Sequence, residues 1–185
     1  GATYTRPNGA GPFPALVLLS VAGANDRNQS FANHHLFHVL ADRFSRNGIA
    51  VLRADDRGVG ASTGEYFRAP YSTLATDAAK LYDFLKSRTE IDSTRIGFLG
   101  HSEGTAIAPL AANLRNTAFL ILLGPLGMVG EEAILAQAHA MGARMGQGRA
   151  CVVLPRHVIV DSFLGKPSTY ADRLCRQLDT KVLFW

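Results

Sequence analysis

The most constraining feature of this sequence is a serine set between two glycines, where an apolar run meets a run of helical periodicity. Gly100-His101-Ser102-Glu103-Gly104 matches the pattern G-x-S-x-G. Residues 95–99 form a short apolar run typical of a strand, and apolar residues recur at helical spacing after Thr105. A strand, a sharp turn and a helix in this order predict a nucleophile elbow, which lifts the serine hydroxyl above the edge of a sheet.

The same five-residue pattern also occurs in unrelated glycine-rich turns, so it has meaning only in its structural context. Here the strand-like run before Ser102 and the helical run after it supply that context. We therefore interpret Ser102 as a candidate nucleophile and the chain as derived from a serine hydrolase.

Composition and charge exclude several other classes of protein. Of the 185 residues, 47% are hydrophobic and 18% charged, which suits one globular domain with a buried core. The net charge of +4 comes from scattered arginines without a basic run, so we expect no nucleic-acid partner. The longest apolar stretch, residues 118–129, is interrupted by Gly124, Pro125 and Gly127. It is shorter than the roughly 20 residues of a membrane-spanning helix, so we expect a soluble protein without a membrane span.

The two cysteines and the first residue leave the compartment open. Cys151 and Cys175 are too far apart for a C-x-x-C redox or zinc motif. We expect two unpaired thiols, with one disulfide as the alternative. The sequence starts at Gly1 without a charged-then-apolar leader, so a signal peptide was removed or never belonged to it. The cytoplasm is favoured over secretion.

Strand-like and helix-like runs alternate along residues 15–124. Apolar runs typical of strands buried on both faces occupy residues 15–19, 49–52, 95–99 and 118–123. Amphipathic helical patterns occupy residues 30–47 and the stretch from Ser72 to Leu85. Strands alternating with helices predict an α/β fold with a mostly parallel, doubly wound sheet.

Beyond this region the pattern loosens. We expect a core over residues 1–127, an excursion over 128–178, and the start of a further core strand over 179–185. The excursion suits a lid over an acyl pocket as well as ordinary packing. Because the sequence stops within the apolar run 182–185, we expect the sheet to be truncated there, with self-association through its unpaired edge.

Two further segments, taken together with the serine turn, form a recognisable combination. They are the run Gly11 to Ser20 and the segment Val51 to Gly64, which ends in the loop Asp55-Asp56-Arg57-Gly58-Val59-Gly60-Ala61-Ser62-Thr63-Gly64. Together with Gly23, Asn25-Asp26-Arg27 and the elbow, they resemble the α/β-hydrolase superfamily. The similarity is to the N-terminal portion of bacterial esterases and serine aminopeptidase-like members, over about residues 2 to 130.

This resemblance implies a sheet of the α/β-hydrolase type and a small-molecule acyl substrate. Ser102 would attack an ester, thioester or amide carbonyl and form an acyl-enzyme that water then hydrolyses, without a cofactor. The oxyanion would be held by the backbone N–H of Glu103 and by one from the loop after the first buried strand, around Ala24.

The charged loop upstream of the serine is expected to be structural. This fold supplies its acid and histidine downstream, so Asp56, Arg57 and Gly58 are expected to tie the loop to the sheet edge, with direct catalysis as the alternative. The loop also contains Gly58-x-Gly60, but no helix begins at once, so we expect no dinucleotide site.

A serine hydroxyl is a poor nucleophile until a histidine accepts its proton. Relatives carry the acid and the histidine later in the chain, so we expect both beyond residue 185. Within the sequence, His157 with Asp161 is the downstream pair, in reversed order, and His157 is the candidate base. We therefore expect this chain to be inactive or impaired; the alternative is a non-catalytic or vestigial domain that binds a ligand or partner.

The spacing of two histidines also raises the possibility of a metal site. His34 and His38 are spaced to share one helix face, but no carboxylate or cysteine cluster accompanies them. We expect no metal site.

Overall fold

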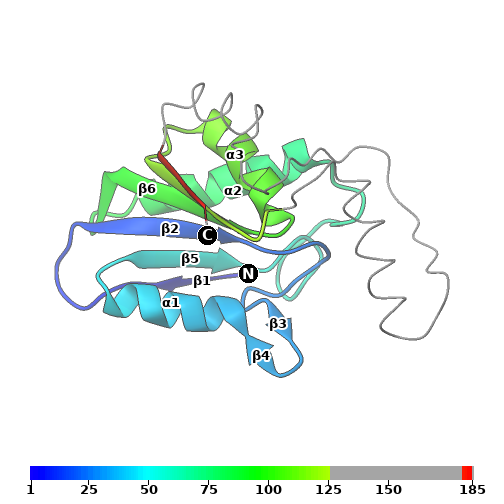
Figure 1. Cartoon of the computed structure of the whole chain (residues 1–185), viewed down its shortest axis with the longest axis horizontal. Helices are drawn as coiled ribbons and strands as arrows, with labels where there is room; N and C mark the ends of the chain where they lie inside the picture. Colours follow the sequence, from blue (N-terminus) through cyan, green and yellow to red (C-terminus); the bar gives the residue numbers. More distant parts are fainter. Residues whose placement is uncertain (126–180, 185) are drawn as a thin grey trace.

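A six-stranded sheet forms the centre of the described part of this computed structural model, which comprises residues 1–125 and the backbone of residues 181–184 (Figure 1). Its strands are β1 (Ala2–Thr5), β2 (Phe13–Leu19), β5 (Ala50–Ala54), β6 (Ile91–His101), β7 (Phe119–Leu123) and β8 (Lys181–Phe184). Their order across the sheet is β1-β5-β2-β6-β7-β8. β1 runs antiparallel to β5, and the other neighbours pair in parallel. The predicted mostly parallel α/β fold is confirmed.

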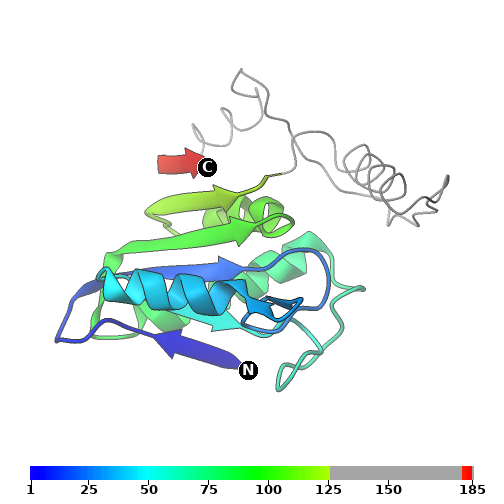
Figure 2. The same cartoon turned by 60° about the horizontal axis from the view of Figure 1, so that its bottom comes forward.

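Helices cover both faces of this sheet. α1 (Leu36–Arg46) lies on one face, and α2 (Tyr71–Lys86) and α3 (Gly104–Leu114) lie on the other. Figure 2 shows α1 in front of the strands, with α2 and α3 behind them.

The two faces of the sheet form two separate apolar cores. Because successive side chains of a strand point to opposite faces, Ala15 and Val17 of β2 enter the core under α2 and α3, whereas Leu16 and Leu18 enter the core under α1. All four are buried. A strand covered on both faces needs apolar residues at every position, which explains the continuous apolar run in the sequence.

The strand order reverses between β2 and β6. From β2 the chain moves outward to β5, returns across β2 to β6, and continues outward to β7 on the other side. Parallel pairing sets Leu19 opposite Gly100, so the segments after these two strands leave the carboxyl edge of the sheet as neighbours. In open α/β sheets, ligands bind where the order reverses in this way.

The helix predicted over residues 30–47 begins only at Leu36. The residues before it form a small antiparallel ribbon of β3 (Ser30–Phe31) and β4 (His34–His35). The two residues of its turn have φ of 48° and 63°, values that a right-handed helix does not contain. The carboxylate of Asp26 also accepts the backbone N–H at the start of the ribbon at 2.8 Å, which satisfies that group outside a helix.

The later start of α1 removes the alternative of a metal site formed by His34 and His38 on one helix face. His34 lies on the ribbon rather than on the helix, so it does not share a helix face with His38. The predicted helix end at Asn47-Gly48 is confirmed, and Gly48 has a φ of +83°. Within residues 1–125 no three His, Cys, Asp or Glu side chains are grouped to hold a metal ion.

Three other element boundaries differ from the sequence analysis. α2 begins at Tyr71, with Pro70 rather than Ser72 at the capping position. β6 begins at Ile91, four residues before the apolar run that predicts it. β1 was not predicted, because an edge strand that is partly exposed has no continuous apolar run.

The C-terminal apolar run is present as a strand, since β8 pairs in parallel with β7 and sets Phe184 opposite Leu122. The division at residues 127 and 178 stays a prediction. The expected excursion, His157, Cys151 and Cys175 lie outside the described residues.

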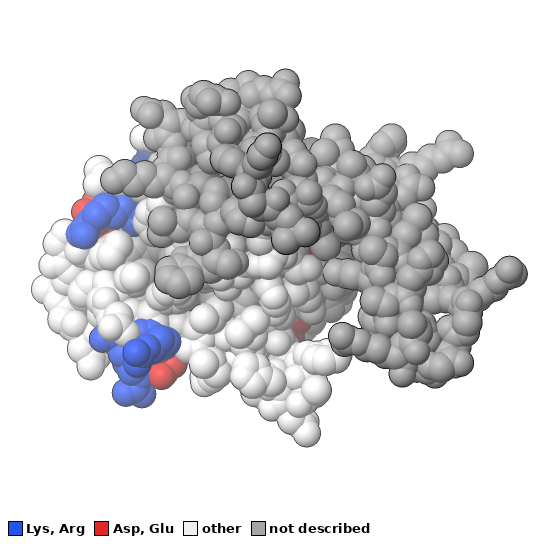
Figure 3. Space-filling view, viewed as in Figure 1, with Lys and Arg blue, Asp and Glu red and all other residues white. Residues whose placement is uncertain are grey.

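Many charged side chains on the described surface lie beside partners of opposite charge. Figure 3 shows separate groups of basic atoms, with acidic atoms next to them, on the face that it presents. Among the exposed pairs, Arg46 contacts Asp42 at 2.9 Å and Arg115 contacts Asp83 at 2.6 Å. None of the helices in the described residues has the length and apolar character to cross a membrane.

The two-sided core predicts very different costs for two leucines near helix ends. Leu85 of α2 is 0% exposed and Leu114 of α3 is 47% exposed. Leu85→Ala should lower the free energy of unfolding by about 2–5 kcal/mol, because it leaves a cavity. The matched Leu114→Ala should cost less than about 1 kcal/mol. Urea unfolding followed by circular dichroism measures both, and equal losses would contradict this assignment of the core.

Candidate active site

Ser102 lies in a turn of strained backbone between β6 and α3. It has a φ of +53°, a region that non-glycine residues seldom occupy. Its N–H donates to the carbonyl of Leu123 at 2.9 Å, and its own carbonyl accepts the backbone N–H of Thr105 at 2.9 Å and the Thr105 hydroxyl at 2.5 Å. The peptide groups before and after Ser102 are therefore both fixed, which holds the serine in this conformation.

The two glycines of the motif are required by close backbone packing. A Cβ at Gly100 would lie 2.2 Å from the carbonyl oxygen of Gly104, and a Cβ at Gly104 would lie 2.3 Å from the carbonyl oxygen of Leu19. Both distances are well below a van der Waals contact. The spacing G-x-S-x-G thus follows from how tightly the turn packs on itself and on β2.

Glu103, the residue after the serine, has an unpartnered backbone N–H among the described residues and a hydrogen-bonded carboxylate. Its backbone N–H has no acceptor among the described residues. Its carboxylate accepts the phenolic hydroxyls of Tyr66 and Tyr71, the latter at 2.8 Å. The sequence analysis missed both tyrosines, because nothing in the sequence links them to a residue more than thirty positions away.

Two successive aspartates at the end of β5 hold the loop after β2. Asp56 Oδ2 accepts the Ser20 hydroxyl at 2.7 Å and the backbone N–H of Asn25 at 2.9 Å, and its own N–H donates to the Asn25 carbonyl at 3.0 Å. Burial raises the pKa of Asp56, although these donors oppose the rise. Ala24, immediately before Asn25, is exposed, and its N–H has no acceptor among the described residues.

Asp55 anchors the same loop through Arg27. Its carboxylate accepts the Arg27 backbone N–H and Nε at 2.9 Å and Nη2 at 2.5 Å. These bonds, led by that of the guanidinium, hold the pKa of Asp55 at about 2, against an ordinary 3.8. The sequence analysis named Ser20 and Arg27 within the segments that carry the resemblance, but it did not predict their hydrogen bonds to the aspartates.

The glycine-rich loop that follows is joined to α2. Arg57 donates from Nε and Nη2 to the Asp77 carboxylate at 2.5 and 2.9 Å, a two-pronged pair. Gly58 has a φ of +76°, and a Cβ there would lie 2.8 Å from the carbonyl oxygen of Gly64. These contacts agree with a structural role for Asp56, Arg57 and Gly58, which stays our proposal.

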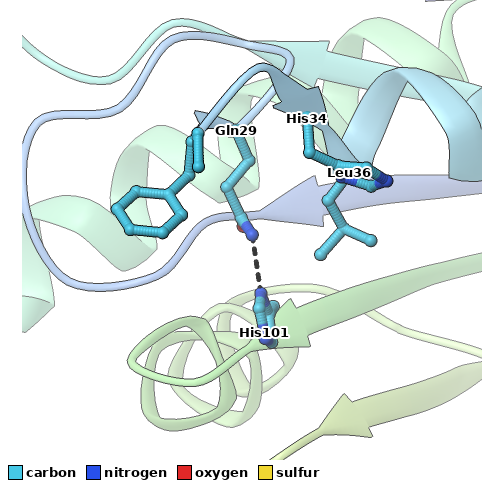
Figure 4. A pocket seen from close by; sticks show the side chains of 6 residues that line it. Gln29, His34, Leu36 and His101 are labelled. Carbon is cyan, nitrogen blue, oxygen red and sulfur yellow. Dashed lines mark hydrogen bonds between the residues drawn. The ribbon is translucent and has the colours of Figure 1, made fainter.

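A pocket of about 370 Å³ opens beside the elbow (Figure 4). At its floor, Gln29 Nε2 lies 2.7 Å from His101 Nδ1, and His101 directly precedes Ser102. Because an amide nitrogen only donates, the ring proton of His101 is assigned to Nε2. Burial lowers the pKa of His101, which favours its neutral form. The lining residues are Gln29, Phe31, Ala32, His34, Leu36 and His101.

The structure thus places the predicted site residues at one edge of the sheet. Ser102 and Glu103 form the turn after β6, and Asp56 bonds to the loop that carries Ala24. The Ser102 hydroxyl makes no hydrogen bond to any described residue, and the candidate base His157 lies outside them.

A mostly parallel sheet, helices on both faces and a serine in a strained turn at the reversal of the strand order define an α/β-hydrolase. The sequence model of the family described as "Serine aminopeptidase, S33" matches residues 31–175. The chain belongs to this family, and the resemblance predicted from the sequence is confirmed.

Comparisons with individual proteins agree with this family. The chain is 29% identical over 130 residues to the esterase EstD of Thermotoga maritima, a match that covers 70% of this chain and 31% of the esterase. It is 31% identical over 131 residues to an uncharacterised protein of Mycobacterium tuberculosis, covering 71% and 43%. The chain therefore spans less than half the length of these curated relatives.

Solved structures show the same fold. The structure of DcsB in complex with its substrate analogue superposes with a TM-score of 0.58 at 20% identity, covering 84% of this chain and 52% of DcsB. Family and relatives together support a serine hydrolase-like function.

The anchor formed by Asp55 predicts a dependence of stability on pH. Because its folded-state pKa is lowered, the Asp55 carboxylate should stabilise the fold above the ordinary 3.8 and lose this effect as the pH falls to about 2. Asp55→Asn should lower the free energy of unfolding by about 2 kcal/mol near neutral pH, and the difference from the wild type should shrink across that window.

Urea unfolding at a series of pH values measures this difference. The control is Asp42→Asn, which removes an exposed ion pair with Arg46 on α1 and should change stability little. If Asp42→Asn lowers the free energy of unfolding as much as Asp55→Asn does, the Asp55 anchor contributes no more than an exposed ion pair.

Proposed function

We propose that this chain is a serine hydrolase that acts on a carboxylic ester, thioester or amide through an acyl-enzyme on Ser102. One observation carries the proposal. Ser102 is held at a φ of +53° at the carboxyl edge of the sheet, next to the backbone N–H of Glu103, which has no acceptor within residues 1–125. Such a turn exposes a serine hydroxyl and sets an oxyanion donor beside it.

The proposed reaction begins when Ser102 Oγ attacks the carbonyl carbon while a base takes its proton. The carbonyl electron pair moves to the oxygen, which becomes negatively charged and accepts the Glu103 N–H. The tetrahedral intermediate collapses, the leaving group departs with the proton, and water later releases the acid from Ser102. His157 is our candidate for the base within this chain.

The second oxyanion donor is proposed in the loop after β2, around Ala24. Support comes from the reversal of strand order, which makes this loop the neighbour of the elbow, and from the bonds of Asp55 and Asp56 that hold it. A donor fixed before the reaction needs no reorganisation when charge develops, which is what makes an oxyanion hole effective.

We also propose that the pocket beside His101 receives an apolar group of the small-molecule acyl substrate. Its walls include Phe31, which is 83% exposed, together with Ala32 and Leu36. A large exposed aromatic side chain that lines an open pocket is available to cover a ligand.

The nucleophile is tested by labelling the folded chain with a fluorophosphonate. The wild type should be labelled slowly, as expected of an impaired chain, and Ser102→Ala should abolish labelling, because the probe reacts only with an activated serine. Ser72→Ala, at an exposed position in α2, is the matched control and should label normally. Loss of labelling in His157→Ala would assign the base. A folded wild type that is not labelled would favour the alternative of a non-catalytic binding domain.

The pocket is tested by Phe31→Ala with acetyl and hexanoyl esters. We expect KM for the hexanoyl ester to rise about tenfold and KM for the acetyl ester to change little, because only the longer chain buries apolar surface against Phe31. Phe84→Ala is the control, since Phe84 is also partly exposed but lies near the end of α2, outside the pocket. Equal effects on both esters would argue against this pocket.

A further inference from the structure

The side chain of Glu103 presents a problem for the proposed chemistry. Its backbone N–H is the expected donor to a developing oxyanion, yet the same residue carries a carboxylate. Two negative charges near one another in a partly buried site repel strongly, because the effective dielectric constant there is well below that of water. A free Glu103 carboxylate would therefore oppose the charge that its own N–H stabilises.

The structure holds this carboxylate through two phenolic hydroxyls. Glu103 Oε2 accepts the hydroxyl of Tyr66, and Oε1 accepts the hydroxyl of Tyr71 at 2.8 Å. Each carboxylate oxygen thus has its own phenolic donor. Tyr66 lies in the loop after β5 and Tyr71 begins α2, so two separate segments converge on one side chain.

Burial supports the assignment of donors and acceptor. Tyr66 is only 8% exposed. Burial, and then the bond to Glu103, raises the pKa of Tyr66 and of Tyr71, so both phenols keep their protons at neutral pH and donate. The nearby Asp56 is already satisfied by Ser20 and Asn25 and does not compete for them.

We propose that Tyr66 and Tyr71 are positioning residues for the oxyanion hole: they hold the Glu103 carboxylate on the α2 side of the elbow and disperse its charge, so that the Glu103 N–H faces the reacting carbonyl oxygen. This inference rests on the proposed function, because it assigns the tyrosines a role in the same acyl transfer.

A merely structural role would use the same hydrogen bonds to join the loop to α3. The two roles differ in what the charge of Glu103 does once the phenols are gone. If the tyrosines only join segments, the charge is irrelevant to the rate at which Ser102 reacts. If they control the charge, its removal restores that rate.

The test measures the rate of fluorophosphonate labelling of Ser102 on folded protein, with urea unfolding in parallel to correct for stability. Tyr66→Phe/Tyr71→Phe should slow labelling on the order of ten- to a hundredfold, because the released carboxylate repels the developing charge. Adding Glu103→Gln, which is neutral and keeps the backbone N–H, should restore labelling to within a few-fold of the wild type. Adding Glu103→Asp, which keeps the charge, should not.

Tyr82→Phe is the matched control. Tyr82 is 1% exposed and donates its hydroxyl to the Asn116 carbonyl at 2.7 Å, away from the elbow. This variant also loses a buried phenolic hydrogen bond and should label at the wild-type rate.

Labelling that is unchanged in the double variant, or slowed equally with Gln and Asp at position 103, would overturn the inference while leaving Ser102 as nucleophile. If the wild type is not labelled at all, no base activates Ser102 within this chain, and the amide resonance of residue 103 in nuclear magnetic resonance spectra then decides. A shift in the double variant that reverses with Glu103→Gln supports the positioning role, and an amide resonance that does not move overturns it.

Discussion

The candidate site depends on one close contact, that of the elbow turn with the end of β2. The carbonyl oxygen of Leu19 occupies the space that a side chain at residue 104 would need, and the carbonyl of Gly104 does the same at residue 100. Because both positions are glycine, α3 can start directly against the sheet. The backbone of Ser102 then has to take a left-handed conformation. The exposure of the serine is thus a result of packing between main-chain atoms.

The neighbouring aspartates show how two identical groups acquire different properties. Asp55 is paired with a guanidinium, which lowers its pKa, whereas Asp56 is half-buried among uncharged donors and its pKa is raised by this burial. Both nevertheless hold the same loop, one at Arg27 and the other at Asn25. Charge pairing at one point and hydrogen bonds from uncharged donors at the other fix the loop beside the elbow.

Much of this arrangement could be predicted from the sequence, for identifiable reasons. The strand β2 was predictable because a strand covered on both faces is apolar at every position, and the elbow because its glycines cannot be replaced. The ribbon before α1 was mistaken for helix, since its turn depends on positive φ angles and on the Asp26 carboxylate, which periodicity does not record. The role of Tyr66 and Tyr71 was missed because their partner is distant in the chain.

The opposite, amino edge of the sheet contains a different set of contacts. There the Tyr82 hydroxyl meets the Asn116 carbonyl, and the guanidinium of Arg88 lies over the ring of Tyr4. These contacts close the turns that lead into β6 and β7, and they lie at the far ends of those strands from the serine. The contacts at the amino edge can therefore change without touching the residues of the candidate site at the other ends of the same strands. A lineage with this fold can change its chemistry by altering one rim while the other keeps the chain folded.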